Sequence, residues 1–155
     1  MSGFVIAKII HILSICMLIG ATLCNGLLHL QAFRSADPDK MSVTLGNVMF
    51  INHFIMAPSF LLIPASGFLL ASFASHPLTE TWLWFSILLT IVLLLAFIIG
   101  YKIESRMEKL IIENGKSNQS HPSRQYYKSF KSAAPIGASA AVLSLIIIYL
   151  MVAKP

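Results

Sequence analysis

Charged residues are scarce in this chain of 155 amino acids. Asp, Glu, Lys and Arg together make up only 11% of it, whereas a soluble domain carries about a quarter. Hydrophobic residues reach 57%, which excludes a disordered chain and argues against a soluble globular enzyme. The length allows a single compact domain. We therefore expect a small integral membrane protein.

Motifs that carry common catalytic chemistry are missing as well. The sequence has no P-loop, no Rossmann glycine pattern, no zinc-ligand spacing and no nucleophile motif. Nucleotide-driven and serine-hydrolase chemistry are therefore unsupported, and no catalytic residue is predicted. Whether the protein is an enzyme stays open. The two cysteines, Cys16 and Cys24, lie about 12 Å apart along one predicted helix, too far for a mutual disulfide.

Four apolar stretches dominate the chain. They cover about 4–30, 45–73, 82–101 and 133–153. Each is long enough to cross a hydrocarbon core, which takes about 20 residues. We therefore predict an all-α fold, a four-transmembrane-helix bundle, in a single integral membrane domain over residues 1–155. The third stretch is almost entirely Leu, Ile, Val and Phe, so we expect it to face lipid most.

The ends and interruptions of these helices carry local signals. Asp37 is suited to cap the second helix, with Pro38 at its first position. Pro58 and Pro64 lie inside that helix, where each removes a backbone donor and predicts a kink. Apolar residues at helical spacing extend the third helix to about residue 114, namely Ile103, Met107, Leu110 and Ile111.

Basic residues set the predicted orientation. They concentrate in segments 31–44 and 102–132, which we therefore place in the cytoplasm, with both termini outside. The predicted location is the bacterial cytoplasmic (inner) membrane, as a multi-pass protein. The excess positive charge then reflects topology and contact with membrane lipid, and no nucleic acid partner is expected. Small residues in stretches 4–30 and 133–153 permit close helix approach, so a homo-oligomer or a membrane protein partner is left open.

Ionisable residues inside membrane spans are expensive and often functional. No Asp or Glu falls inside the four predicted stretches, but Lys8 and His11 share a face of the first helix. His11 fits two interpretations. It is a ligand for a metal or haem iron, or it forms an interhelical hydrogen bond to a serine or a carbonyl while Lys8 reaches outward. Ser66 and Tyr149 are expected at similar depth, so a cofactor-binding pocket of Lys8, His11, Ser66 and Tyr149 is our hypothesis.

A second polar layer is predicted nearer the cytoplasmic side. Asn25, His29, Asn52 and His53 contribute to it. We interpret this layer as a hydrogen-bonded interfacial cluster in preference to a binding site. His53 is a second, weaker candidate for a metal ligand, and its different depth disfavours one haem held between His11 and His53.

Short motifs along most of the chain resemble a bacterial family of integral membrane proteins, domain of unknown function 2269. The matching positions are Lys8-Ile-Ile-His11-Ile-Leu-Ser14, Gly20, Arg34-Ser35-Ala36-Asp37, Pro58, Pro64, Gly67, Pro77-Leu78, Trp82-Leu83, Arg106-Met107, Pro135 and Lys154-Pro155. The Lys-x-x-His start also resembles the four-helix membrane protoporphyrinogen oxidase and copper-resistance D type proteins. That resemblance implies His11 as an axial ligand of b-type haem, with Lys8 beside it.

Three functional hypotheses follow. The first is a membrane protein that binds haem b or acts in a redox process, with His11 as ligand. The second is a non-enzymatic accessory or assembly subunit of a membrane complex. The third is a small transporter or copper-handling protein, which would need a continuous polar path through the bundle.

Overall fold

The computed structural model describes residues 2–35, 37–74, 80–116 and 123–153, and these are almost entirely helical. Its elements are α1 (Ser2–Ser35), α2 (Pro38–Ile51), η1 (Asn52–Met56), α3 (Ala57–Phe73), α4 (Thr81–Lys116) and α5 (Arg124–Ala153). A single turn of π-helix, η1, joins α2 and α3 into one span. The described residues contain four helices long and apolar enough to cross a membrane and no strand. The predicted all-α, four-span fold is confirmed.

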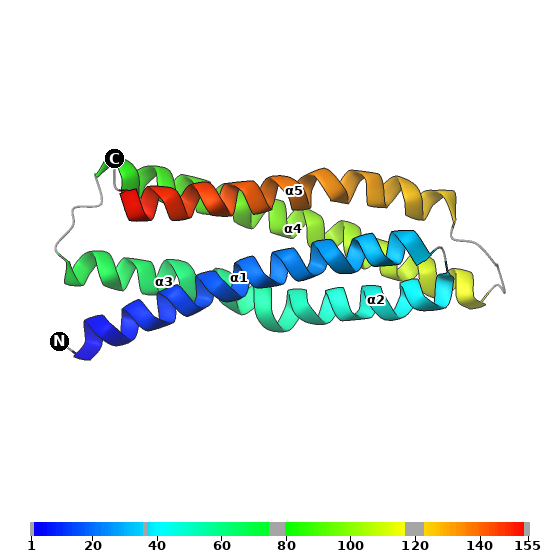
Figure 1. Ribbon diagram of the computed structural model, residues 1–155, viewed down its shortest axis with the longest axis horizontal. Helices are drawn as coiled ribbons and strands as arrows, with labels where there is room; N and C mark the ends of the chain where they lie inside the picture. Colours follow the sequence, from blue (N-terminus) through cyan, green and yellow to red (C-terminus); the bar gives the residue numbers. More distant parts are fainter. Residues whose placement is uncertain (1, 36, 75–79, 117–122, 154–155) are drawn as a thin grey trace.

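The four spans form an elongated bundle (Figure 1). Helix α1 packs against α2 and α3, α4 packs against α5, and α2 also contacts α4. The beginning of α1 and the end of α5 lie at the same end of the bundle, together with the end of α3. The end of α1, the beginning of α2, the end of α4 and the beginning of α5 lie at the opposite end, so the basic residues of these helix ends share one side. Pro77, Leu78, Lys154 and Pro155, which carry part of the family resemblance, lie outside the described residues.

All four spans extend beyond the apolar stretches at this second end, where α1 continues to Ser35. Helix α2 begins at Pro38 and not near 45, because the Asp37 side chain accepts hydrogen bonds from the amides of Asp39 (3.0 Å) and Lys40 (3.5 Å). The predicted N-cap is thus present. Helix α5 begins at Arg124 and not near 133, and α4 continues to Lys116. The extensions are held by a hydrophobic cluster of Ala32, Met41, Leu45, Met107, Ile111 and Tyr126.

The first predicted proline kink takes the form of the π-turn. Pro58 has no N–H to donate to the carbonyl of Phe54, so the regular α-helical ladder is interrupted just before it. The preceding turn widens, and the Ala57 amide bonds to the Asn52 carbonyl five residues back. π-Turns of this kind occur often at functional sites. Here the turn contributes two buried residues, Asn52 and Met56, to the interior.

Helix α5 differs from the prediction in how much of it is covered. Only 6% of the residues in its most apolar stretch are buried, against 17% for α4 and 28% for the other two spans. Within the described bundle the fourth span, and not the third, is therefore the least buried, and which span contacts most lipid stays a prediction. The small residues of α5 also do not bring this helix into close packing with α1 along the groove. They line a groove instead, because Ala and Gly leave the space between the helices unfilled.

Candidate functional site

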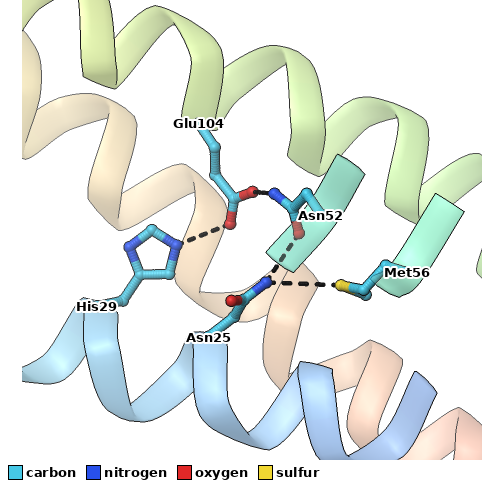
Figure 2. A network of polar contacts seen from close by, with 5 residues as sticks. All are labelled: Asn25, His29, Asn52, Met56 and Glu104. Atoms are coloured by element: carbon cyan, nitrogen blue, oxygen red, sulfur yellow. Dashed lines mark hydrogen bonds and ion pairs between the residues drawn. The ribbon is translucent and has the colours of Figure 1, made fainter. Parts of the chain in front are cut away.

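Five side chains from α1, η1 and α4 form a connected polar network inside the bundle (Figure 2). Glu104 of α4 is its centre. His29 Nε2 lies 2.7 Å from Glu104 Oε1, and Asn52 Nδ2 donates to Glu104 Oε2 at 2.5 Å. Asn25 Nδ2 donates to Asn52 Oδ1 at 2.7 Å and lies 3.5 Å from Met56 Sδ. The side chains of His29 and Glu104 are each only 14% exposed.

The network includes a carboxylate that lies beyond the predicted third stretch. That stretch ends at 101, and Glu104 follows three residues later in the same helix, α4. A signal for this residue is present in the sequence. Glu104 precedes Met107 by three positions and Ile111 by seven, so it shares their face of the helix. Both of those residues are fully buried, and Glu104 therefore points inward as well.

The predicted second polar layer is confirmed for three of its four members. Asn25, His29 and Asn52 belong to the network. His53 does not. Its side chain is exposed, and its ring contacts Phe54 edge-on with 5.1 Å between the centroids. His53 is one residue from Asn52, and adjacent helical residues point in directions about 100° apart, which takes it away from the interior.

The network lines a groove of about 630 Å³. Asn25, His29, Asn52 and Glu104 form its polar wall. The remainder is mostly apolar, with Leu18, Leu23, Leu27, Leu30, Phe60, Leu93, Phe97 and Phe130 among the lining residues. Another wall is formed by small residues of α5, namely Ala133, Ala134, Gly137, Ala138, Ala140 and Ala141. A volume of this size with a few convergent polar groups is typical of small-molecule sites.

His11 occupies a different environment near the other end of α1. It is 9% exposed, and its Nδ1 lies 3.0 Å from Ser66 Oγ and 3.1 Å from the carbonyl oxygen of Ile63. The Ser66 hydroxyl donates its own hydrogen to the Leu62 carbonyl, so Nδ1 carries the proton and Ser66 accepts it. The predicted interhelical bond to a serine or carbonyl is therefore present. The ring also lies against Gly67, where a Cβ atom would be 3.1 Å from His11 Cε1.

The space beside His11 is small. A cavity of about 40 Å³ adjoins it, lined from all four spans, with Phe60, Thr90, Ser144 and Met151 among the neighbours. Sites for drug-sized molecules occupy roughly 300–1,000 Å³. The residues around His11 therefore orient an imidazole but, as packed here, do not fit a haem macrocycle.

The pocket hypothesized from the sequence assembles only in part. His11 and Ser66 are in contact. Lys8 is exposed, and Tyr149 is 64% exposed. Neither Lys8 nor Tyr149 lines the cavity at His11. Lys8 lies near the start of α1 and Tyr149 near the end of α5. At these positions an outward-facing cation or phenol reaches the membrane surface more easily than the interior.

The fold and the buried network together define a small four-span integral membrane protein with an ionisable cluster inside its bundle. A family model described as "Predicted integral membrane protein (DUF2269)" matches residues 5–155, and the chain belongs to this family. No curated protein and no solved structure gives a significant match. The first resemblance noted from the sequence is thereby confirmed, and the likeness to the oxidase and to the copper-resistance protein stays a prediction.

Proposed function

We propose that this protein binds a lipophilic small molecule within the membrane, in the groove bounded by α1, η1, α4 and α5. One observation carries the proposal: a groove of about 630 Å³ has apolar walls and, on one side, a hydrogen-bonded carboxylate network. A bundle that served only to pack would be expected to fill such a volume with side chains. Intramembrane ionisable groups facing a cavity usually mark a ligand or ion pathway.

Glycines on two sides of the groove allow a direct test. Gly100 and Gly137 both line it, and a Cβ at either position meets nothing within 4 Å. Gly100→Leu and Gly137→Leu should therefore fill the groove without a clash. Gly20→Leu is the matched control, because Gly20 is equally unobstructed but does not line the groove.

The measurement is mass spectrometry of organic extracts from protein purified in mild detergent. A molecule that binds the groove should co-purify in stoichiometric amount with the wild type and the Gly20→Leu variant. It should be lost from Gly100→Leu and Gly137→Leu. Equal recovery from all four proteins, or recovery of bulk membrane lipid alone, would contradict the proposal.

A second proposal, binding of b-type haem with His11 as axial ligand, has one observation in its favour. The hydrogen bonds that the described residues give the ring use Nδ1, which leaves Nε2 for a ligand. Fixing one ring nitrogen on a carbonyl is how proteins commonly orient a ligating histidine. Haem at this position requires α1 to separate from its neighbours, because the adjoining cavity holds only about 40 Å³.

Optical spectra of the purified protein separate this second proposal from the first. A stoichiometric Soret band that His11→Ala abolishes would support haem, and copper analysis of the same samples tests a copper-handling role. Spectra with protein absorbance only, together with a stable set of co-purifying membrane proteins, would favour the accessory or assembly subunit. Deletion phenotypes in metal uptake or tolerance would favour the transporter.

The proposed orientation places both termini outside the bacterial inner membrane and segments 31–44 and 102–132 on the cytoplasmic side, so the end of the groove at Glu104 lies at the cytoplasmic surface of the membrane. Two observations support it. Those segments contain most of the basic residues, and the start of α1 and the end of α5 both lie at the opposite end of the bundle (Figure 1). A reporter active only outside the cytoplasm, fused after residue 155, should be active. An inactive fusion beside an active cytoplasmic reporter would reverse the assignment.

A further inference from the structure

The hydrogen bonds of the network all run toward Glu104. Asn25 donates to Asn52, and Asn52 in turn donates to the carboxylate. The other carboxylate oxygen faces His29 Nε2 at 2.7 Å, which is hydrogen-bonding distance for an N–H donor. In the arrangement described, Asn52 bonds to one carboxylate oxygen of Glu104 and the His29 ring lies against the other.

No lysine or arginine neutralises this carboxylate within the described parts of the chain, where its one ion-pair partner is His29. Basic residues near it in sequence, Lys102 and Arg106, are exposed. A buried anion in a medium of low dielectric constant is costly unless a positive charge or several donors compensate it. Among the described residues, His29 is therefore the one basic side chain beside this carboxylate at the groove wall.

Two further polar atoms belong to residues of the network. Asn25 Oδ1 and His29 Nδ1 are buried and have no hydrogen-bond partner among the described residues. The Asn25 residue is only 6% exposed, and Figure 2 shows its oxygen outside the dashed network. Both residues also line the groove, but these two atoms expose almost no surface to it, so they are not contact points for an occupant.

The apolar part of the groove adds a second requirement. Its aromatic lining residues are Phe60, Phe97, Tyr101 and Phe130. Aromatic faces attract cations as well as apolar groups. An occupant must therefore combine a hydrogen-bond-donating, positively charged end with an apolar body.

We infer that the ligand of the groove is a lipophilic amine, whose protonated nitrogen binds beside Glu104 while its hydrocarbon part lies along α5. This inference rests on the proposed ligand-binding function and specifies its chemistry. The ammonium group supplies a positive charge and N–H donors to the Glu104 carboxylate, which lies at the wall of the groove.

Three probes with the same twelve-carbon chain separate the contributions. Dodecylamine carries charge and N–H donors, dodecyltrimethylammonium carries charge alone, and dodecanol carries a donor alone. Binding to full-length protein in phosphatidylcholine nanodiscs is followed by native mass spectrometry and by the shift in unfolding temperature. The expected order places dodecylamine first. Glu104→Gln should weaken dodecylamine by about tenfold or more and leave dodecanol unchanged.

Two more variants keep the test decisive. Asn25→Ala removes the hydrogen bond that orients the Asn52 amide on Glu104, so a smaller loss of dodecylamine binding is expected. It stands in for Glu104→Gln if that variant does not fold. Glu108→Gln is the matched control, because Glu108 lies one turn further along α4, outside both the network and the groove lining.

The outcomes distinguish the two claims. If dodecanol binds as well as dodecylamine, or Glu104→Gln leaves dodecylamine unaffected, the amine inference is overturned. The proposed function survives that result if Gly100→Leu and Gly137→Leu still displace a bound molecule. If the groove-filling variants change nothing for any probe, both claims fall.

Discussion

Two histidines on one helix have opposite surroundings. His11 and His29 lie about five turns, or roughly 27 Å, apart on the same face of α1. His11 is wedged against Gly67 of α3, with about 40 Å³ of free space beside it. His29 is bound to a carboxylate at the wall of a groove of about 630 Å³.

The difference separates two uses of a polar residue in a membrane. Around His11 the acceptors Ile63 O and Ser66 Oγ belong to α3, so the histidine connects two helices that are already packed. Around His29 the network leaves acceptors unpartnered and space unfilled. Burial alone does not distinguish the two sites. The volume next to each ring and the balance of donors and acceptors do.

Removing the centre of the network should have the largest effect on stability. Glu104→Ala leaves the His29 and Asn52 donors unpartnered in the interior, and each such buried group costs about 1–3 kcal/mol. We expect a pronounced fall in unfolding temperature in detergent, followed by the fluorescence of Trp82 and Trp84. Glu108→Ala, on the same helix and outside the network, should change the temperature little. Equal effects of the two substitutions would mean that Glu104 has no special role.

The His11 site should respond to volume and not to charge. A methyl group at Gly67 would lie 3.1 Å from His11 Cε1, so Gly67→Ala forces the ring to shift. Overpacking of this kind costs about 1–3 kcal/mol. In a His11→Ala background the same methyl group has room, and the penalty should disappear. A double-mutant cycle on unfolding measures this coupling. Additive effects would show that the ring and Gly67 are not packed together.

The sequence predicts the fold of this protein better than its site. Long apolar stretches are enough to locate four spans, and Asp37 with Pro38 marks where α2 begins. Glu104 is missed because a boundary drawn by hydropathy ends at 101, although the helix and its buried face continue. Lys8 and Tyr149 are misplaced in the hypothesized pocket because similar depth in the membrane does not imply the same helix face. The groove has no local signal, since it depends on how helices far apart in the sequence pack around the small residues of α5.

Single hydrogen bonds sharpen the contrast at a smaller scale. Ser66→Ala removes one of two acceptors for His11 Nδ1, and the Ile63 carbonyl remains. Side-chain hydrogen bonds between membrane helices average about 0.6 kcal/mol, so a slight fall in unfolding temperature is expected. Asn52→Ala interrupts the network on both sides and should cost more. A larger effect from Ser66→Ala than from Asn52→Ala would reverse the ranking of the two sites.

The smallest effect is expected at a carboxylate outside the spans. Asp37 caps α2 and lies 3.4 Å from the Lys40 ammonium. Desolvation raises the pKa of the Asp37 carboxyl, but the Asp39 and Lys40 amides and the Lys40 charge outweigh it, so the pKa lies below its usual value near 3.8. Its contribution to stability is therefore present above that usual value and is lost as the pH falls through the lower, folded-state pKa.

Water and salt already solvate and screen the Asp37 group, so Asp37→Ala should lower the unfolding temperature less than Glu104→Ala at pH 7. The small difference between Asp37→Ala and the wild type should narrow further as the pH is lowered past 3.8. Unfolding curves of both proteins between about pH 3 and 7 test this, in the range where a carboxylate with a depressed pKa takes up its proton. A difference that widens toward acid pH would contradict the sign. If Asp37→Ala lowered the unfolding temperature as much as Glu104→Ala, burial inside the bundle would not explain the contribution of Glu104 to stability.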